Sequence, residues 1–346
     1  MRAAVMRNQQ IVVDEIADPV PGPGEVLAET IACGICGSDL HALVHSAELI
    51  KVAIDTGLSA MAWDQTRDVV MGHEFSARIL ELGPGVDSVE IGAEVAAMPG
   101  HRSGGRMVGV GYSNDYPGGY GERMVLGERS LRVIPNGLDP KLAALTEPTA
   151  VGLHAVNRSS VGELGQGALV IGTGPVGLSI IASLAARGVA PIVAADFSPT
   201  RRRLAEVMGA HVVVDPREQP AIEALAAETG SRRDPVVAFE AVGVPGTIDE
   251  QMRSLPRNSE LVIAGVCMQS DTIWPTYGIN KELTLRFVLG WTPDEFTESL
   301  HNIAEGRIDV APLVTGEVGI DGVADAFTAL ADPETHAKIL VRPSRS

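Results

Sequence analysis

The chain has 346 residues, 45% of them hydrophobic and 21% charged, which excludes a disordered protein and leaves room for two domains. A net charge of −17 argues against nucleic acid or an anionic membrane as a partner, and no apolar stretch is long enough to span a bilayer. Three cysteines are too few for a disulfide framework, and the N-terminus lacks the apolar core of a signal peptide. We therefore expect a cytoplasmic protein and look to its thiols for chemistry.

The N-terminal part, from Met1 to about Leu145, alternates short apolar runs with glycine turns. Strands are expected at Gln10–Val13, Gly24–Ile31, Ser76–Leu82, Glu94–Met98, Gly121–Val125 and Leu131–Val133. This spacing is typical of a compact, barrel-like β domain. The interval from about Ser46 to Asp68 differs, because it has few strand signals, and it predicts one or two helices.

The stretch from Ala168 to Asp196 carries the pattern of a dinucleotide site. A buried strand is expected at Ala168–Ile171, a helix at Leu178–Ala186, and a second strand at Ile192–Ala195. Between the first strand and the helix, a G-x-G-x-x-G motif places its glycines at Gly172, Gly174 and Gly177. Side chains there would block the tight turn and the approach of a pyrophosphate to the helix N-terminus. The order of these elements predicts a nicotinamide-cofactor protein.

The residues around this motif bear on the choice of cofactor. Pro175 and Val176 complete the motif, and Asp196 follows it by about twenty residues. An acid at that place suits the ribose hydroxyls of NAD and would repel the extra phosphate of NADP. Arg201 and the two arginines after it leave an alternative open, since they could bind that phosphate instead.

From about Pro148 to Val288 strands and helices alternate, as in a doubly wound parallel sheet. Further strands are expected at Val212–Val214, Val236–Glu240, Leu261–Val266 and Leu283–Leu289. The last segment predicts helices at Pro293–Ala304 and Val323–Leu330 and a final strand at Ala337–Val341.

The β domain also carries a group of metal-ligating residue types. Cys33, Cys36, Asp39 and His41 share one loop, and these are followed further on by His73, Glu74 and Glu147. Zinc favours thiolate, imidazole and carboxylate ligands, and its catalytic sites keep three protein ligands and an open position. Each of these residues, taken alone, is more readily explained as structural than as a metal ligand. A four-cysteine site is excluded, because no second C-x-x-C exists.

These motifs together resemble the zinc-dependent medium-chain dehydrogenase family, the alcohol and polyol dehydrogenases. The matching stretches are Pro21–Val26 (PGPGEV), Gly34–His41 (GICGSDLH), Gly72–Glu74 (GHE), Gly92–Pro99, Gly118–Val125 (GGYGERMV), Glu147–Pro148, the glycine motif and Lys281–Phe296 (KELTLRFVLGWTPDEF). The resemblance covers nearly the whole chain in the right order. It implies an α/β protein with a GroES-like β-barrel catalytic domain (1–148, completed by 289–346), a Rossmann domain (149–288), and an active site between them.

The resemblance also implies roles for single residues. Cys36, His73 and Glu147 correspond to the ligands of a catalytic zinc. Glu74 stands where relatives carry a carboxylate that approaches or ligates the metal, so three and four protein ligands both stay possible. Asp39 would orient the imidazole of His73. Cys33 is expected to pack in the core, and so is Cys267, on a predicted strand.

The implied reaction is hydride transfer between an alcohol and NAD, with the zinc as a Lewis acid. The alcohol proton must leave a closed cleft. The resemblance places Ser38 beside the substrate oxygen and His41 at the outer end of a proton relay. Alternatively, Ser38 is an ordinary turn serine and His41 is a solvent-facing histidine.

Two departures from the family pattern shape the remaining expectations. Many relatives bind a structural zinc with four closely spaced cysteines, but the corresponding stretch, Pro99–Arg106, has none, so we expect one zinc per chain. The interval between Cys36 and His73 is long, and we expect Leu49–Trp63 near the cleft mouth.

The pocket and its substrate follow from that placement. Trp63 and Trp291 would shape an apolar pocket or, alternatively, fill core space. Polyol dehydrogenases often carry an arginine near Leu289–Trp291, and this chain does not, which favours a secondary or aromatic alcohol. A polyol dehydrogenase is the alternative, followed by a metal-free quinone or enone reductase and a non-enzymatic nucleotide-binding protein. The resemblance further implies a homodimer or homotetramer.

Overall fold

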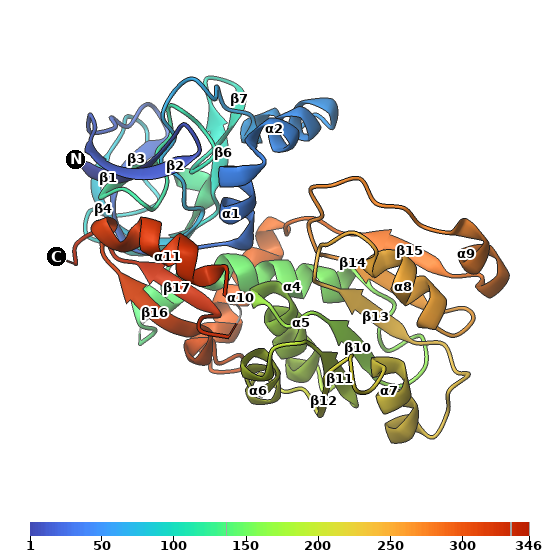
Figure 1. Cartoon of the computed structure of the whole chain (residues 1–346). Coiled ribbons are helices and arrows are strands. Elements are labelled where there is room, and N and C mark those ends of the chain that lie inside the picture. The colour runs from blue at the N-terminus through green and yellow to red at the C-terminus, as the bar shows by residue number, and fades with distance from the viewer. Residues whose placement is uncertain (136, 333, 346) are drawn as a thin grey trace.

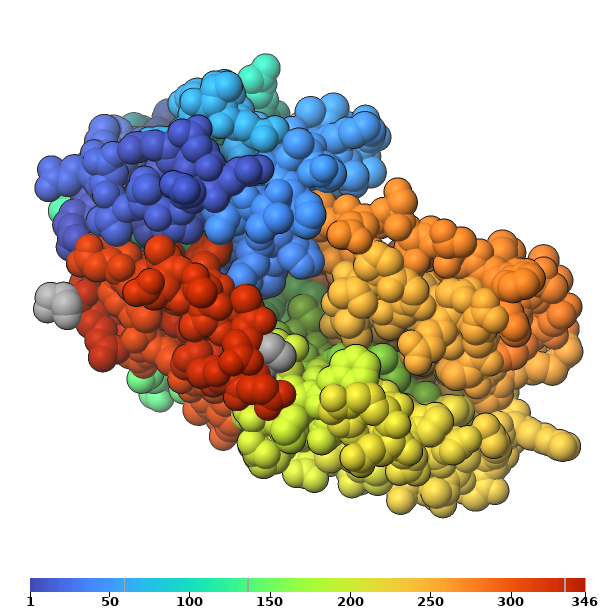
Figure 2. All heavy atoms as spheres, in the orientation of Figure 1, coloured from blue at the N-terminus to red at the C-terminus, as the bar shows by residue number. Residues whose placement is uncertain are grey.

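The computed structural model describes residues 1–135, 137–332 and 334–345. Figure 1 shows two lobes: the N-terminal part and the C-terminal segment form one, and the middle of the chain forms the other. Figure 2 shows the surface hollowed between the two lobes, with residues from the middle of the chain at the floor of the hollow. The domain limits near residues 148 and 289 stay a prediction.

The first lobe is built on a largely antiparallel sheet of order β16-β17-β3-β4-β5-β9, with β8 paired to β3. Its strands are β3 (Glu25–Gly34), β4 (Glu74–Leu82), β5 (Glu94–Ala97), β8 (Arg123–Gly127), β9 (Leu131–Val133), β16 (Val314–Val318) and β17 (Lys338–Val341). Two hairpins add β1 (Arg2–Arg7) to β2 (Gln10–Glu15) and β6 (Gly100–Ser103) to β7 (Arg106–Gly109). Strand β17 pairs antiparallel with β3, so the end of the chain completes the N-terminal sheet.

The second lobe has an entirely parallel sheet of order β12-β11-β10-β13-β14-β15. Its strands are β10 (Ala168–Ile171), β11 (Ile192–Ala195), β12 (Val212–Val214), β13 (Val237–Glu240), β14 (Glu260–Ile263) and β15 (Thr284–Phe287). Its helices are α5 (Pro175–Ala186), α6 (Pro199–Val207), α7 (Ala221–Thr229), α8 (Thr247–Ser254) and α9 (Pro275–Lys281). This order is doubly wound, and its switch point between β10 and β13 is where such sheets bind ligands.

The remaining helices cover the first lobe and the junction. They are α1 (Gly37–Val44), α2 (Ser46–Asp55), α3 (Pro140–Ala143), α4 (Thr146–Arg158), α10 (Pro293–Ala304) and α11 (Val323–Leu330), with short 3₁₀ turns at Ser59–Met61, Glu128–Ser130, Ala311–Leu313 and Ile320–Gly322. Helix α4 lies at the junction of the two lobes, and α1 borders the hollow between them (Figure 1). Both helices carry predicted site residues.

The α/β fold class and most predicted elements are confirmed, including both helices of the last segment and α2 within the long interval. The prediction for Cys267 is wrong: β14 ends at Ile263, and the thiol is partly exposed in the following loop. Within the described ranges, no helix is long and apolar enough to cross a membrane.

Candidate active site

A buried carboxylate, Asp39, organises the predicted metal site. It stands in the first turn of α1, where one oxygen accepts hydrogen bonds from the Cys36 amide (3.0 Å) and the Tyr120 hydroxyl (2.6 Å). The other oxygen accepts from the Tyr112 hydroxyl (3.2 Å) and lies 3.2 Å from His73 Nδ1, at an angle short of a regular hydrogen bond. Burial alone would raise the pKa of Asp39, but the charge on His73 and these hydrogen bonds hold it below its usual range. Asp39 is therefore an anion that faces the imidazole.

Three of the predicted metal residues meet beside Asp39. Single ligand atoms of Cys36, His73 and Glu74 all lie within 4.8 Å of one another. Burial opposes a charge on His73, but the Asp39 carboxylate outweighs it and raises the pKa of the imidazole well above its usual range. The surroundings of His73 therefore favour a positive charge on its ring. A thiol, an imidazole and a carboxylate are a donor set that suits zinc.

Glu74 has a cationic partner that sequence reasoning missed. Lys338, from β17, lies 2.8 and 2.7 Å from its two oxygens, and both side chains are buried. The lysine also donates to the carbonyl of Ile35 (3.0 Å). Gly34 stands opposite Glu74, and a Cβ there would lie only 2.1 Å from its carboxylate. Only the pairing of the chain's two distant ends brings this lysine to the site, so no local signal could have revealed it.

Glu147 lies outside that closest group. It is buried in the first turn of α4 and accepts a hydrogen bond from Trp291 Nε1 (2.9 Å). Burial raises the pKa of Glu147, and the charge of Glu74 adds to this rise against the opposing effect of His73. The Glu147 carboxylate is thus close enough to His73 and Glu74 for their charges to shift its pKa. Trp291 also packs against Phe296, with ring centroids 5.2 Å apart.

The predicted relay residues lie on α1. Ser38 Oγ is 3.5 Å from His73 Nε2 and accepts a hydrogen bond from the Tyr112 hydroxyl (3.0 Å). His41 is half-buried, and its Nδ1 has no hydrogen-bond partner among the described residues. Burial and the charge of His45 lower the pKa of His41, so the ring is neutral at neutral pH. Tyr112 was missed because nothing in its local sequence marks it.

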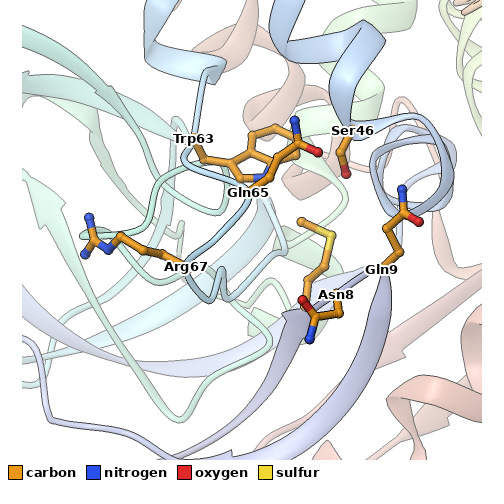
Figure 3. Close-up of a pocket in the computed structure, with 7 residues that line it drawn as sticks. Asn8, Gln9, Ser46, Trp63, Gln65 and Arg67 are labelled. Carbon is orange, nitrogen blue, oxygen red and sulfur yellow. The ribbon is translucent and has the colours of Figure 1, made fainter.

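Trp63 lies behind Tyr112. It is 6% exposed, and the two rings stack with centroids 5.8 Å apart. Its other neighbours line a polar pocket of about 280 Å³, shown in Figure 3. That pocket is formed by Met6, Asn8, Gln9, Ser46, Trp63, Gln65 and Arg67. None of the predicted metal residues is among them, so Trp63 separates this pocket from Tyr112.

The glycine motif joins β10 to α5. A Cβ at Gly177 would lie 2.0 Å from the carbonyl oxygen of Gly172, so the helix can approach the loop only without a side chain. The helix begins at Pro175, earlier than expected, with Gly174 as its N-cap and Val176 in its first turn. Its free N–H groups point where a pyrophosphate would lie.

Asp196 follows β11 and reaches back to this loop. One carboxylate oxygen accepts from the amide (2.8 Å) and the hydroxyl (3.1 Å) of Thr173, and the other accepts from the Ser198 amide (2.9 Å). Thr173 was not among the predicted cofactor residues. Arg201, in α6, has a buried Nε without a hydrogen-bond partner among the residues described.

A sheet with a dinucleotide loop, joined to a lobe that gathers zinc-type ligands at the junction, defines an oxidoreductase that uses a nicotinamide cofactor. Residues 22–136 match the alcohol dehydrogenase GroES-like domain, and residues 175–305 match the zinc-binding dehydrogenase domain. The chain belongs to the zinc-dependent medium-chain dehydrogenase family.

Known proteins of similar sequence agree with this assignment. The (R,R)-butanediol dehydrogenase of Bacillus subtilis is 35% identical over 356 residues, which cover 99% of this chain and all of the relative. Sorbitol dehydrogenase of the same organism is 28% identical over 360 residues, covering 100% and 98%. The crystal structure of 2R,3R-butanediol dehydrogenase from B. subtilis matches with a TM-score of 0.84 at 32% identity, covering 99% of both chains. The prediction of an alcohol or polyol oxidoreductase is confirmed.

Proposed function

We propose that this chain is a zinc- and NAD-dependent dehydrogenase that interconverts a secondary alcohol and its ketone. The observation that carries the proposal is the meeting of Cys36, His73 and Glu74 within 4.8 Å, in the lobe that faces the dinucleotide loop. The names of the butanediol dehydrogenases favour a small secondary alcohol over a primary one. A polyol is the second candidate, favoured by the likeness to sorbitol dehydrogenase.

Cys36 and His73 would hold the zinc, with Glu147 or Glu74 as a further ligand. When bound, the zinc would act as a Lewis acid on the alcohol, and the nicotinamide would take its hydride. The Asp39 carboxylate faces Nδ1 of His73 at 3.2 Å and would orient the ring so that Nε2 is left for the metal. Lys338 engages both oxygens of Glu74, which supports Glu147 as the third ligand in the resting site.

One zinc per chain is proposed. The stretch where many relatives carry four cysteines forms the hairpin β6–β7, and His101 from this hairpin bonds to Glu25 (3.1 Å). Within the described part of the chain, Cys36, His73 and Glu74 form the one group of three or more metal-ligating side chains. These observations support a single zinc site, at Cys36 and His73.

The alcohol loses a hydride to the nicotinamide and a proton to the protein, and the ketone remains. Ser38 Oγ would receive this proton on an oxygen lone pair while it passes its own hydroxyl proton outward through the cofactor ribose. His41 would accept the relayed proton at the outer end, because burial keeps its ring neutral.

NAD is proposed over NADP. Asp196 stands at the end of β11 beside the glycine loop, where its charge would repel a 2′-phosphate. Arg201 is the residue that would oppose this preference. Comparable catalytic efficiency with both cofactors contradicts the proposal.

We also propose a homodimer or homotetramer and a cytoplasmic location. Strand β15 is the edge of the parallel sheet, and Phe287 in it, Leu289 beyond it and Ile279 in α9 are largely exposed. An unpaired edge flanked by apolar side chains suits pairing with a second copy. Sedimentation as a monomer at micromolar concentration would refute it. Free thiols on all three cysteines agree with a reducing compartment.

The segment Leu49–Trp63 is proposed as a wall or entrance of the substrate pocket. Trp63 supports this role through its stacking on Tyr112, which touches Ser38. Trp63→Ala should change the ranking of bulky against small alcohols and leave cofactor affinity nearly unchanged. An unchanged ranking at full activity makes the segment structural.

A panel of alcohols and ketones, assayed with NAD and NADP on metal-analysed protein, tests the proposed function. We expect NAD reduction with secondary alcohols that disappears when the metal is removed. Activity on enones or quinones that survives metal removal would favour a reductase. No turnover of any alcohol or ketone would favour a nucleotide-binding protein without enzymatic activity.

A further inference from the structure

Tyr112 presents a hydroxyl beside the serine that is proposed to touch the reacting oxygen. Its oxygen lies 3.0 Å from Ser38 Oγ, and its ring lies 5.1 Å from the ring of His73. Tyr112 is 5% exposed, whereas Ser38 is only half-buried. A substrate that reaches Ser38 therefore meets the Tyr112 hydroxyl directly behind it.

The position of this hydroxyl is fixed from two sides. The tyrosine ring contacts the rings of both His73 and Trp63, and Trp63 stacks on it at an interplanar angle of 28°. The preceding Gly111 packs on the backbone of Gly72, where a Cβ would lie 2.7 Å from the Gly72 carbonyl oxygen. The hydroxyl therefore cannot swing away when a ligand arrives, and such preorganised groups discriminate best between ligands.

Asp39 does not depend on Tyr112 for its hydrogen bonds. The Asp39 carboxylate also accepts hydrogen bonds from the Cys36 amide and the Tyr120 hydroxyl. The hydrogen bond from Tyr120, at 2.6 Å, is much shorter than the one from Tyr112, at 3.2 Å. The Tyr112 hydroxyl has one proton for two acceptors, Asp39 and Ser38. While that proton lies toward Asp39, the phenolic oxygen is able to accept a hydrogen bond.

We propose that Tyr112 recognises a second substrate oxygen on the carbon next to the reacting one, so that the preferred substrates are vicinal diols and α-hydroxy ketones. Ser38 Oγ and the Tyr112 oxygen are one hydrogen bond apart, which matches the separation of two oxygens on neighbouring carbons in a gauche arrangement. A diol donates its second hydroxyl to Tyr112, and an oxo group there accepts from it. The proposal rests on the proposed function.

The test is the ratio of kcat/KM for 2,3-butanediol over 2-butanol, which differ only in the second hydroxyl. Wild type should prefer the diol. Tyr112→Phe should lower this ratio about tenfold, mainly because kcat/KM for the diol falls. Tyr120→Phe is the matched control, because the Tyr120 hydroxyl also donates to Asp39 but, in the described part of the chain, makes no hydrogen bond to Ser38. Tyr120→Phe should slow the oxidation of both alcohols to the same extent and leave the ratio unchanged.

A wild-type measurement keeps the proposal testable if Tyr112→Phe does not fold. In 3-methyl-2-butanol a methyl group of similar size replaces the second hydroxyl, so this alcohol can neither donate to nor accept from Tyr112 and should lose the preference shown by the diol. Equal use of this alcohol and the diol, or an unchanged ratio in Tyr112→Phe, overturns the inference. Failure of wild type to oxidise either alcohol overturns the proposed function instead.

Discussion

The dinucleotide loop and the metal site differ in how the chain builds them. The loop comes from one stretch, 168–196, and its contacts join residues close in sequence, such as Gly172 with Gly177 and Thr173 with Asp196. The metal site is assembled from α1, the start of β4, the start of α4 and the end of the chain in β17. Backbone shape governs the first site, and long-range side-chain pairing governs the second.

Two glutamates show what the long-range pairing achieves. Glu74 is paired directly with the buried Lys338, whereas the hydrogen bond to Glu147 comes from the neutral indole of Trp291, and the pKa of Glu147 is raised by burial. Of the two carboxylates, Glu147 is therefore the one that no cation among the described residues contacts directly. A metal ion would supply that charge.

The largest expected effect is at Cys36. Cys36→Ser replaces a soft thiolate by a hard hydroxyl, so it should lose the zinc and lower kcat by at least about a thousandfold. Metal analysis and steady-state kinetics measure both losses. Cys33→Ala is the control: this thiol is fully buried, and burial raises its pKa, so the variant should keep its zinc. A Cys36→Ser protein with full zinc and activity would contradict the assignment.

The next largest expected effect is a loss of folding stability in Lys338→Met. The substitution leaves the Glu74 carboxylate buried without a partner, which costs about 3–5 kcal/mol of unfolding free energy. Urea denaturation measures this loss. The double variant Glu74→Gln/Lys338→Met should recover most of it, and a loss below about 1 kcal/mol in Lys338→Met would show that the pair does not matter.

Asp196→Ala should weaken the binding of NAD and lower the preference for NAD over NADP by about ten- to a hundredfold. The preference is the ratio of kcat/KM values for the two cofactors. Thr173→Val is the control, since it removes one hydrogen bond to Asp196 but keeps the charge, and the ratio should persist. A ratio that falls equally in both variants would point to the loop tether rather than the charge.

His45→Gln should have the smallest effect. Burial and, to a smaller extent, the charge of His45 lower the pKa of His41, so removing His45 should raise the pKa of His41. Neutral His41 accepts the proton, and activity is lost as the pH falls through its pKa. The acid limb of kcat/KM should therefore move to higher pH in His45→Gln, and an unmoved limb would exclude His41 from the relay.

The sequence was sufficient for the fold class, the family and the locally encoded elements. The helices at Pro293–Ala304 and Val323–Leu330 were predicted at their observed limits, because the apolar periodicity that defines a helix is local in the sequence. Lys338 and Tyr112 were not, since a lysine or tyrosine in a strand or loop carries no sign of its distant partner. Cys267 was misplaced because the apolar run after Ile263 continues beyond the strand.

The zinc content of the purified wild-type chain tests the central claim most directly. The account predicts one tightly held zinc per chain by elemental analysis, bound at Cys36 and His73. Two tightly held zinc ions per chain would contradict the proposal of a single zinc site. No zinc in a chain that still oxidises alcohols would contradict the metal site itself.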